Sequence, residues 1–167
     1  MSVSVRPLTP DDYEALRAIR LEALRRAPAF FAADPAIEEA YTKEQWLTRL
    51  ATAVSFGGYV DGKLAGLVVF SRPTSIKLSH TGDIGAMYVR DAARGTGLAD
   101  AMMEALLDHA AGVVEQVKLT VNAENARAIK FYERHGFTPI GKIPRSLNID
   151  GRFYDDLMMM RRVSSSD

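Results

Sequence analysis

The sequence predicts a mixed α/β fold of the α+β kind, with about seven strands and about four helices in one domain. A length of 167 residues suits a single domain, and neither an internal repeat nor a linker rich in proline, glycine or serine divides the chain. A stretch typical of a β-hairpin occurs early, and a strand–helix–strand–helix–strand order follows it. These observations predict one domain over 1–167, in which 164–167 form a frayed tail.

The first third of the chain predicts one strand and two helices. Thr9 can cap the first helix, and Pro10 fits its first position because an N–H at that position has no helical partner. Apolar side chains then recur at helical spacing, and Thr42 caps a second helix. The expected elements are a strand over 3–8, a helix over 9–27, an irregular stretch over 28–41 and a helix over 42–52. On the first helix, a solvated face is expected from Arg17, Arg20, Arg25 and Arg26.

The remaining elements are mostly strands. Asp61-Gly62 is a strong two-residue hairpin signal between two apolar runs, and Gly136 is expected to end the last helix in a left-handed conformation. The expected strands cover 56–60, 64–70, 83–89, 117–121, 137–143 and 153–160. Helices are expected over 98–111 and 123–135.

Composition excludes several classes of function. The chain has no cysteine, so it can form neither a disulfide, nor a thiolate nucleophile, nor a cysteine-based metal site. With three histidines far apart in the sequence, no metal cofactor is expected. Lys+Arg and Asp+Glu total 21 each, whereas a protein that binds nucleic acid through phosphate neutralisation is usually basic. No apolar run approaches the ~20 residues of a membrane helix, and the N-terminus lacks the pattern of a signal peptide, which favours a cytoplasmic protein without nucleic-acid or membrane partners.

The turn that follows the strand over 83–89 carries the first chemical signal. Its glycines let a ligand approach the backbone, the next helix begins with free N–H groups, and Arg94 adds a permanent cation, so the turn is typical of a pyrophosphate site. A Walker loop is absent, and Asp100 stands where a dinucleotide fingerprint needs its third glycine. The pattern that does fit is Arg/Gln-x-x-Gly-x-Gly/Ala, made here by Arg94, Gly97 and Ala99.

A second motif follows the strand over 117–121. It has the form Asn-x-x-Ala-x-x-Phe/Leu-Tyr-x-x-x-Gly-Phe, and its fixed positions are Asn125, Ala128, Phe131, Tyr132, Gly136 and Phe137. With both motifs in this order and at this separation, the sequence resembles the GNAT superfamily of N-acetyltransferases. The likeness is good over 83–160 and extends over 3–70 in element order only. One departure is Asp91, where the family often has proline, and we expect from it a small geometric effect only.

The resemblance implies a mostly antiparallel sheet in which two central parallel strands splay apart and receive acetyl-CoA. The pantetheine arm would pair with backbone near Met87 and Val89, as an added strand does, and Asn125 would touch it from the next helix. Tyr132 would act as the general acid that protonates the leaving thiolate of CoA. The implied cofactor-binding residues are Met87, Tyr88, Val89, Arg94, Gly95, Thr96, Gly97, Leu98, Ala99, Asn125, Ala128, Phe131 and Tyr132.

Without cysteine, an acetyl-enzyme on sulfur cannot form, so direct attack by an amine in a ternary complex is favoured. A base must take a proton from that amine, and Asp83 is the preferred candidate. Because it precedes Val89 by six residues, alternation places it on the same strand face as Met87 and Val89. Other candidate bases are Glu22, Glu38, Glu39 and His80.

The acceptor site of the family is usually built from the region between the first two helices and from the link between the last strands. Here these are 29–41, which is acidic, and 144–152, which carries Arg145 and Arg152. The first would suit a cationic amine and the second an amine that bears a carboxylate, so the sequence does not choose. The family also makes a homodimer a candidate state, although no interface can be assigned.

Two other functions remain as alternatives to an N-acetyltransferase. One is an acyl-CoA-binding regulatory module without turnover, which an intact Tyr132 disfavours. The other is a nucleotide-binding or RNA-associated protein that uses the Arg94 turn, which the neutral charge and the absent Walker lysine disfavour.

Overall fold

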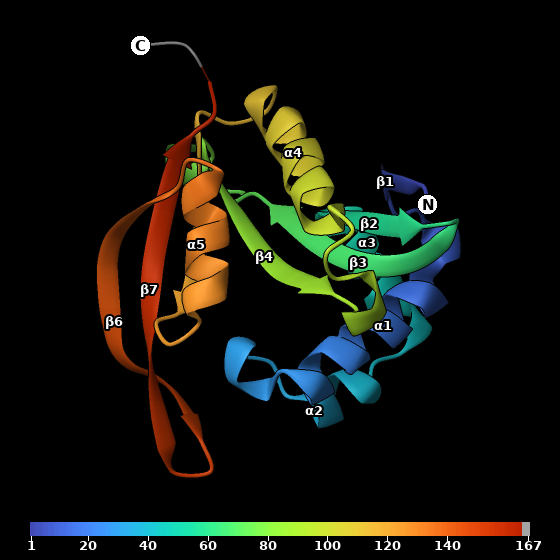
Figure 1. Cartoon of the computed structure of the whole chain (residues 1–167), viewed down its shortest axis with the longest axis horizontal. Helices are drawn as coiled ribbons and strands as arrows, with labels where there is room; N and C mark the ends of the chain where they lie inside the picture. Colours follow the sequence, from blue (N-terminus) through green and yellow to red (C-terminus); the bar gives the residue numbers. More distant parts are fainter. Residues whose placement is uncertain (165–167) are drawn as a thin grey trace.

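The computed structural model describes residues 1–164 and contains one seven-stranded sheet with helices on both of its faces (Figure 1). The strands lie in the order β1-β2-β3-β4-β5-β7-β6. They are β1 (Val3–Pro7), β2 (Val54–Val60), β3 (Lys63–Ser71), β4 (Thr81–Val89), β5 (Gln116–Asn122), β6 (Thr138–Ile149) and β7 (Arg152–Arg162). The α-helices are α1 (Tyr13–Arg26), α2 (Pro35–Glu39), α3 (Lys43–Thr52), α4 (Leu98–Ala111) and α5 (Ala126–Arg134). Four 3-10 turns complete the elements: η1 (Pro10–Asp12), η2 (Pro28–Phe30), η3 (Ile76–Leu78) and η4 (Asp91–Ala93).

The centre of the sheet is open at one end, as the sequence predicts. Neighbouring strands are antiparallel except β4 and β5, which are parallel and pair only from Thr81 with Gln116 to Asp83 with Lys118. Beyond these three pairs the two strands part, and Figure 1 shows β4 and β7 diverging toward the bottom of the view. The predicted mixed, mostly antiparallel sheet with splayed central strands is therefore confirmed.

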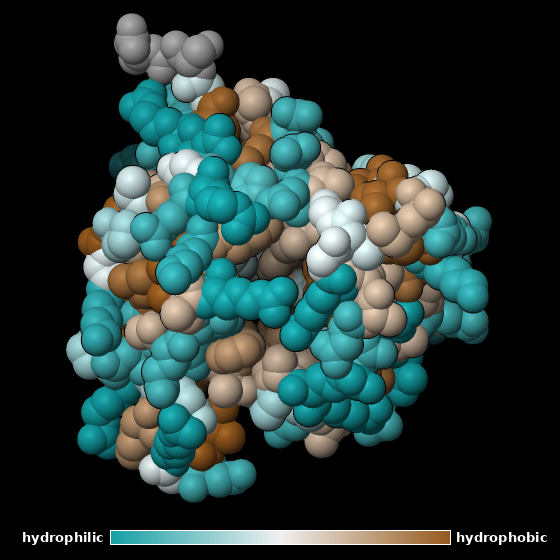
Figure 2. All heavy atoms as spheres, in the orientation of Figure 1, coloured by the Kyte–Doolittle hydropathy of each residue, from teal (hydrophilic) through white to brown (hydrophobic). Residues whose placement is uncertain are grey.

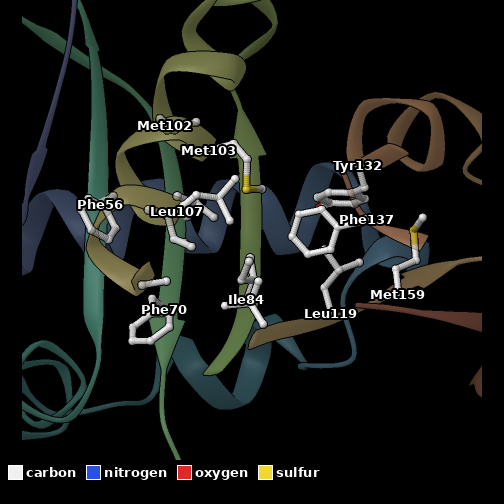
Figure 3. Close-up of a cluster of buried hydrophobic side chains, with 14 of the residues drawn as sticks. Phe56, Phe70, Ile84, Met102, Met103, Leu107, Leu119, Tyr132, Phe137 and Met159 are labelled. Carbon is white, nitrogen blue, oxygen red and sulfur yellow. The ribbon is translucent and has the colours of Figure 1, made fainter. Parts of the chain in front are cut away.

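Two apolar clusters attach the helices to the sheet. The larger packs α4 and α5 on one face and includes Met102, Leu107 and Tyr132 (Figure 3). The smaller packs α1 and α3 on the opposite face through Leu16, Ile19 and Trp46. Because helices pack on both faces, side chains on either face of the sheet near its open end contact a helix layer.

A β-bulge in β4 changes which side chains face each layer. Val69 pairs with Gly85 and Leu67 pairs with Tyr88, so Val68 alone is opposed by the two residues Ala86 and Met87. Ala86 has φ 56°, a left-handed conformation that is uncommon for a residue with a side chain. The alternation of side chains is therefore shifted by one residue between the two ends of β4.

The last two strands are longer than predicted. Residues 144–149 belong to β6, and only a turn at Asp150-Gly151 joins β6 to β7, so the predicted long link over 144–152 is wrong. Proline is tolerated here because β6 is an edge strand, where one side of the backbone needs no ladder hydrogen bond. The hairpin extends beyond the body of the molecule in Figure 1.

Smaller differences concern helix ends and the C-terminus. The predicted irregular stretch contains η2 and the short α2, and α5 begins at Ala126, three residues later than predicted. Gly136 has the expected left-handed conformation, with φ 86°. Of the predicted frayed tail, 165–167 lie outside the described residues, while the Ser164 N–H donates to Glu115 O over 3.3 Å. Among the helices of residues 1–164, none is both long and apolar enough to span a bilayer.

Candidate active site

The turn between β4 and α4 presents a row of backbone donors. Gly95 and Gly97 have φ 78° and 84°, values that favour glycine, and α4 begins directly after them. Within residues 1–164, no acceptor is found for the N–H groups of Gly95, Thr96, Gly97 and Ala99. Free N–H groups at a helix N-terminus are a site for an anion such as phosphate.

Three charged side chains near this turn form one ion-pair cluster. Asp91 binds Arg94 over 3.2 Å and Arg26, from the end of α1, over 3.1 Å. The two arginines and one aspartate leave a net positive charge beside the free N–H groups. Asp91 thus takes part in two ion pairs at this turn, and one of them joins the turn to the exposed Arg26 side chain at the end of α1.

A cavity of about 440 Å³ opens from this turn into the gap beyond the β4–β5 pairs. Figure 2 shows a hollow in this face of the molecule, between α5 and the turn before α4. Of the thirteen predicted cofactor-binding residues, all except Thr96 line the cavity. Phe30 and Phe31 also line it, from the stretch after α1, as does Arg127 at the start of α5.

Two of the predicted residues shape the site by binding backbone. The Thr96 hydroxyl donates to Ala93 O over 2.5 Å and accepts from the Leu98 N–H, which fixes the turn before α4. The Asn125 side chain accepts from the Ala128 N–H over 3.2 Å and so caps α5 at the cavity wall. The polar groups of both residues thus stabilise the backbone on either side of the cavity.

Tyr132 lies on α5 with its ring packed among other aromatic rings. Its centroid is 5.4 Å from that of Phe131 and 5.9 Å from that of Phe137, in edge-on geometry. No hydrogen bond joins its hydroxyl to another of the described residues, and the side chain lines the first cavity. Burial raises the pKa of Tyr132 to about 12, so the phenol keeps its proton at neutral pH.

A second cavity, of about 370 Å³, lies on the α1 and α3 face of the sheet. Asp83 lines this cavity, not the first one. The bulge is the reason: Ile84, Met87 and Val89 pack in the larger cluster, whereas Ala86 and Tyr88 pack in the smaller one. The prediction that Asp83 shares a face with Met87 and Val89 is therefore wrong, because counting by twos fails across Ala86.

The bulge of β4 contributes lining residues to both cavities. Met87 lines the first cavity and Ala86 lines the second, so adjacent residues of one strand face both spaces. Asp83 lies three residues before Ala86, and its carboxylate is 3.6 Å from the Lys118 ammonium.

The other predicted bases have partners elsewhere. Glu38 is buried and binds Arg20 and Arg49, Glu39 pairs with Arg25 on the surface, and Glu22 accepts from the Tyr88 hydroxyl over 2.8 Å. His80 lies before β4 and lines neither cavity. Of the predicted bases, Asp83 is thus the one that lines a cavity.

The two arginines predicted for the acceptor region lie away from both cavities. Arg145 stacks on the ring of Phe153, Arg152 binds Glu124 over 3.1 Å, and neither residue lines either cavity. Instead, Arg20 and Arg49 line the second cavity. No sequence signal distinguished them, because their convergence depends on how α1 and α3 pack. Among residues 1–164, no group of three or more acidic, histidine or cysteine residues could hold a metal ion.

Comparison with known proteins shows which family has this sequence and fold. The model of the acetyltransferase (GNAT) family matches residues 16–137. L-amino acid N-acetyltransferase AaaT of Escherichia coli (strain K12) is 26% identical over 164 residues, which cover 95% of this chain and 97% of that protein. A mycothiol acetyltransferase of Beutenbergia cavernae is 45% identical over 77 residues, 45% of this chain but only 26% of that longer protein.

Solved structures share the whole fold. A GNAT-family acetyltransferase of Streptococcus pneumoniae superposes with a TM-score of 0.85 at 23% identity, over 97% of this chain and 99% of that one. The structure of yncA from Salmonella typhimurium, solved with its cofactor acetyl-CoA, gives 0.83 at 18% identity, over 100% of this chain and 97% of that one. With the family model covering residues 16–137 and the splayed sheet and donor-rich turn in place, the chain belongs to the acetyltransferase (GNAT) family.

Proposed function

We propose that the protein transfers the acetyl group of acetyl-CoA to a primary amine, by direct attack in a ternary complex. The observation that carries this proposal is that adjacent residues at the bulge of β4 line two different cavities, Met87 the first and Ala86 the second. Direct transfer requires two substrates held close together, and cavities that flank the same short stretch of β4 favour this.

The first cavity suits acetyl-CoA. The free N–H groups of 95–97 and Ala99, together with Arg94, would bind the pyrophosphate. The backbone of Met87 and Val89, freed from β5 by the splay, offers hydrogen-bonding groups to the amides of the pantetheine arm. When bound, acetyl-CoA supplies an activated acyl carbon and a thiolate leaving group.

The second cavity suits the acceptor. An ammonium must lose a proton before its nitrogen can attack, and the Asp83 carboxylate in this cavity is the group we assign to accept it. A carbon–nitrogen bond then forms as the carbon–sulfur bond breaks. Because the chain has no cysteine, no thiol of the protein can carry the acetyl group between the substrates.

Tyr132 would supply a proton to the departing sulfur. Its phenol lines the first cavity and is fully protonated at neutral pH, since its pKa is raised to about 12 by burial. A phenol of ordinary pKa near ~10 is already a weaker acid than the CoA thiol, whose class has a pKa near ~8.5, and burial of Tyr132 widens this difference. The role is therefore a hydrogen bond that stabilises the developing thiolate, and a proton that passes fully to the sulfur is replaced on the phenolate by the second proton that the attacking nitrogen loses.

A thiol-release assay tests the proposal. The protein is mixed with acetyl-CoA and a panel of amines that spans amino acids, polyamines, aminoglycosides and peptides. Because the chain has no cysteine, a thiol reagent detects released CoA alone. Amine-dependent release together with a product heavier by one acetyl group is expected. Tight acetyl-CoA binding with no release across the panel would instead establish the alternative, a binding module without turnover.

A further inference from the structure

Two arginines in the second cavity share one buried carboxylate. Arg20 on α1 donates to both oxygens of Glu38, from Nε over 3.0 Å and from Nη2 over 3.2 Å. Arg49 on α3 donates to the same carboxylate from Nη1 over 3.0 Å. Glu38 is on α2, so three helices are joined at this point, and both arginines line the cavity wall.

This cluster carries a net positive charge. Burial would raise the pKa of Glu38, but the hydrogen bonds and charges of Arg20 and Arg49 outweigh it and lower that pKa, which keeps the carboxylate ionised. Within residues 1–164, Glu38 is the one carboxylate that pairs with either arginine. Two guanidinium groups and one carboxylate leave one uncompensated cation at the cavity.

The two arginines differ in which of their donors Glu38 occupies. The Arg20 fork is occupied by Glu38 in bidentate geometry, whereas Arg49 uses only Nη1 and leaves Nε and Nη2 without a partner among the described residues. Its guanidinium carbon lies 5.1 Å from the centre of the Tyr41 ring and 5.3 Å from that of Trp46, so its plane is supported. A preoriented guanidinium binds a carboxylate with two parallel hydrogen bonds.

The rest of the cavity restricts what is attached to that carboxylate. Leu16 and Val69 contribute to an apolar wall, and three hydroxyl residues also line the cavity: Thr52, Ser55 and Ser71. Asp83 supplies a carboxylate, 3.6 Å from the Lys118 ammonium. The cavity volume of 370 Å³ is near the lower end of the volume of small-molecule sites, about 300–1,000 Å³. The charges therefore match a small zwitterion, with its carboxylate at Arg49 and its ammonium at Asp83.

We infer that the acceptor is a free α-amino acid with an apolar side chain, and that Arg49 determines this specificity by binding its carboxylate, while Arg20 holds Glu38 in place. The inference rests on the proposed function, since it names the occupant of the acceptor cavity. It also replaces Arg145 and Arg152, which the sequence suggested for the same task and which lie outside the cavity.

The test compares each of phenylalanine, methionine and leucine with its own amide, in steady-state assays at saturating acetyl-CoA. We expect the wild-type protein to have a kcat/KM at least tenfold higher for the amino acids than for the amides. Arg49→Gln should lower kcat/KM for the amino acids about 10- to 100-fold, mostly through KM, and change that for the amides less than twofold. Arg49→Lys keeps the positive charge but cannot form two parallel hydrogen bonds. Its kcat/KM for the amino acids should therefore lie between that of the wild type and that of Arg49→Gln.

Arg49 is the residue to change because its removal leaves the Arg20–Glu38 pair intact, and thermal unfolding checks that the variant is folded. Arg25→Gln, on the same helix as Arg20 but paired with Glu39 on the surface, is the matched control and should behave as wild type. Equal losses for amino acids and amides in Arg49→Gln, or a wild-type preference for amides, would overturn the inference. Acetylation of other amines but of neither class would overturn it while the proposed function stands, whereas no acetylation of any amine would overturn both.

Discussion

Tyr132 meets Phe137 edge-on, with the two ring centroids 5.9 Å apart. Removing the hydroxyl leaves this contact in place, so Tyr132→Phe separates the chemistry of the phenol from its packing. If the phenol donates to the leaving sulfur, kcat should fall about 100-fold, in the usual range for loss of a general acid. Acetyl-CoA affinity, measured by calorimetry, should change less than twofold.

The matched control for this variant is Tyr59→Phe, since Tyr59 lies on β2 under the Arg6 guanidinium and lines neither cavity. It should keep full turnover. The pH profile gives a second readout, because a pKa of about 12 keeps Tyr132 protonated below about pH 11. An unchanged kcat in Tyr132→Phe would remove the phenol from the mechanism.

Gly97→Ala tests the anion site at the start of α4. An added Cβ would meet nothing within 4 Å, so the cost comes from the left-handed backbone, at about 1–2 kcal/mol. A shift of the backbone to relieve that strain would turn the N–H groups of the turn away from the pyrophosphate. We expect a lower free energy of unfolding and an acetyl-CoA Kd raised at least tenfold.

Gly62→Ala is the control for strain alone. Gly62 has φ 78° in the turn between β2 and β3, and an added Cβ there also has open space. Both variants should lose similar stability in denaturant unfolding, but only Gly97→Ala should lose acetyl-CoA affinity. Equal affinity in the two variants would mean that the turn before α4 does not bind the pyrophosphate.

The sequence was most informative where function depends on one continuous segment. The free N–H groups before α4 come from 95–99, and the cavity wall made by α5 comes from 125–132, so motifs of fixed spacing could indicate both segments. The bulge escaped prediction because its left-handed residue is Ala86 and no glycine marks it. The consequence was large, since a shift of one residue sends Asp83 to the opposite face of the sheet.

The lining of the second cavity escaped prediction for a different reason. Arg20, Glu38, Arg49 and Asp83 lie on four separate elements, and only tertiary packing brings them together. Arginines on a helix usually extend into solvent, yet the Arg20 side chain is only 14% exposed because Glu38 compensates its charge. The spacing of these residues along the chain therefore could not predict that they come together.

The pairing of Arg6 with Asp12 gives a pH-dependent contribution to stability. Hydrogen bonds from Arg6, over 2.8 and 3.0 Å, hold the pKa of the Asp12 carboxyl well below its usual value, and the Thr9 N–H also donates to it. A lowered folded-state pKa stabilises the protein above the unfolded-state value of about 3.9. This contribution is lost as the pH falls from there toward the folded-state pKa.

Asp12→Asn should therefore lower the melting temperature at pH 7, and the difference from wild type should shrink as the pH is lowered below about 4. Asp11→Asn, at the exposed neighbouring position, controls for the loss of a negative charge near the start of α1. Calorimetric scans between pH 3 and pH 7 measure both variants. A difference that stays constant over this range would show that the ion pair does not contribute to stability.

Asp83→Asn tests which group takes the proton of the amine. Without the carboxylate, the enzyme depends on the fraction of amine that is already neutral. At pH values below the amine pKa, this fraction rises about tenfold for each unit by which the pH increases. We expect kcat/KM at pH 7 to fall at least tenfold and the variant to approach wild type as the pH rises. Lys118→Gln is the control, because it breaks the 3.6 Å pair and leaves the carboxylate in the second cavity. If the Asp83 variant acts only through loss of that pair, both variants will lose the same activity, and the role of base passes from Asp83 to another group.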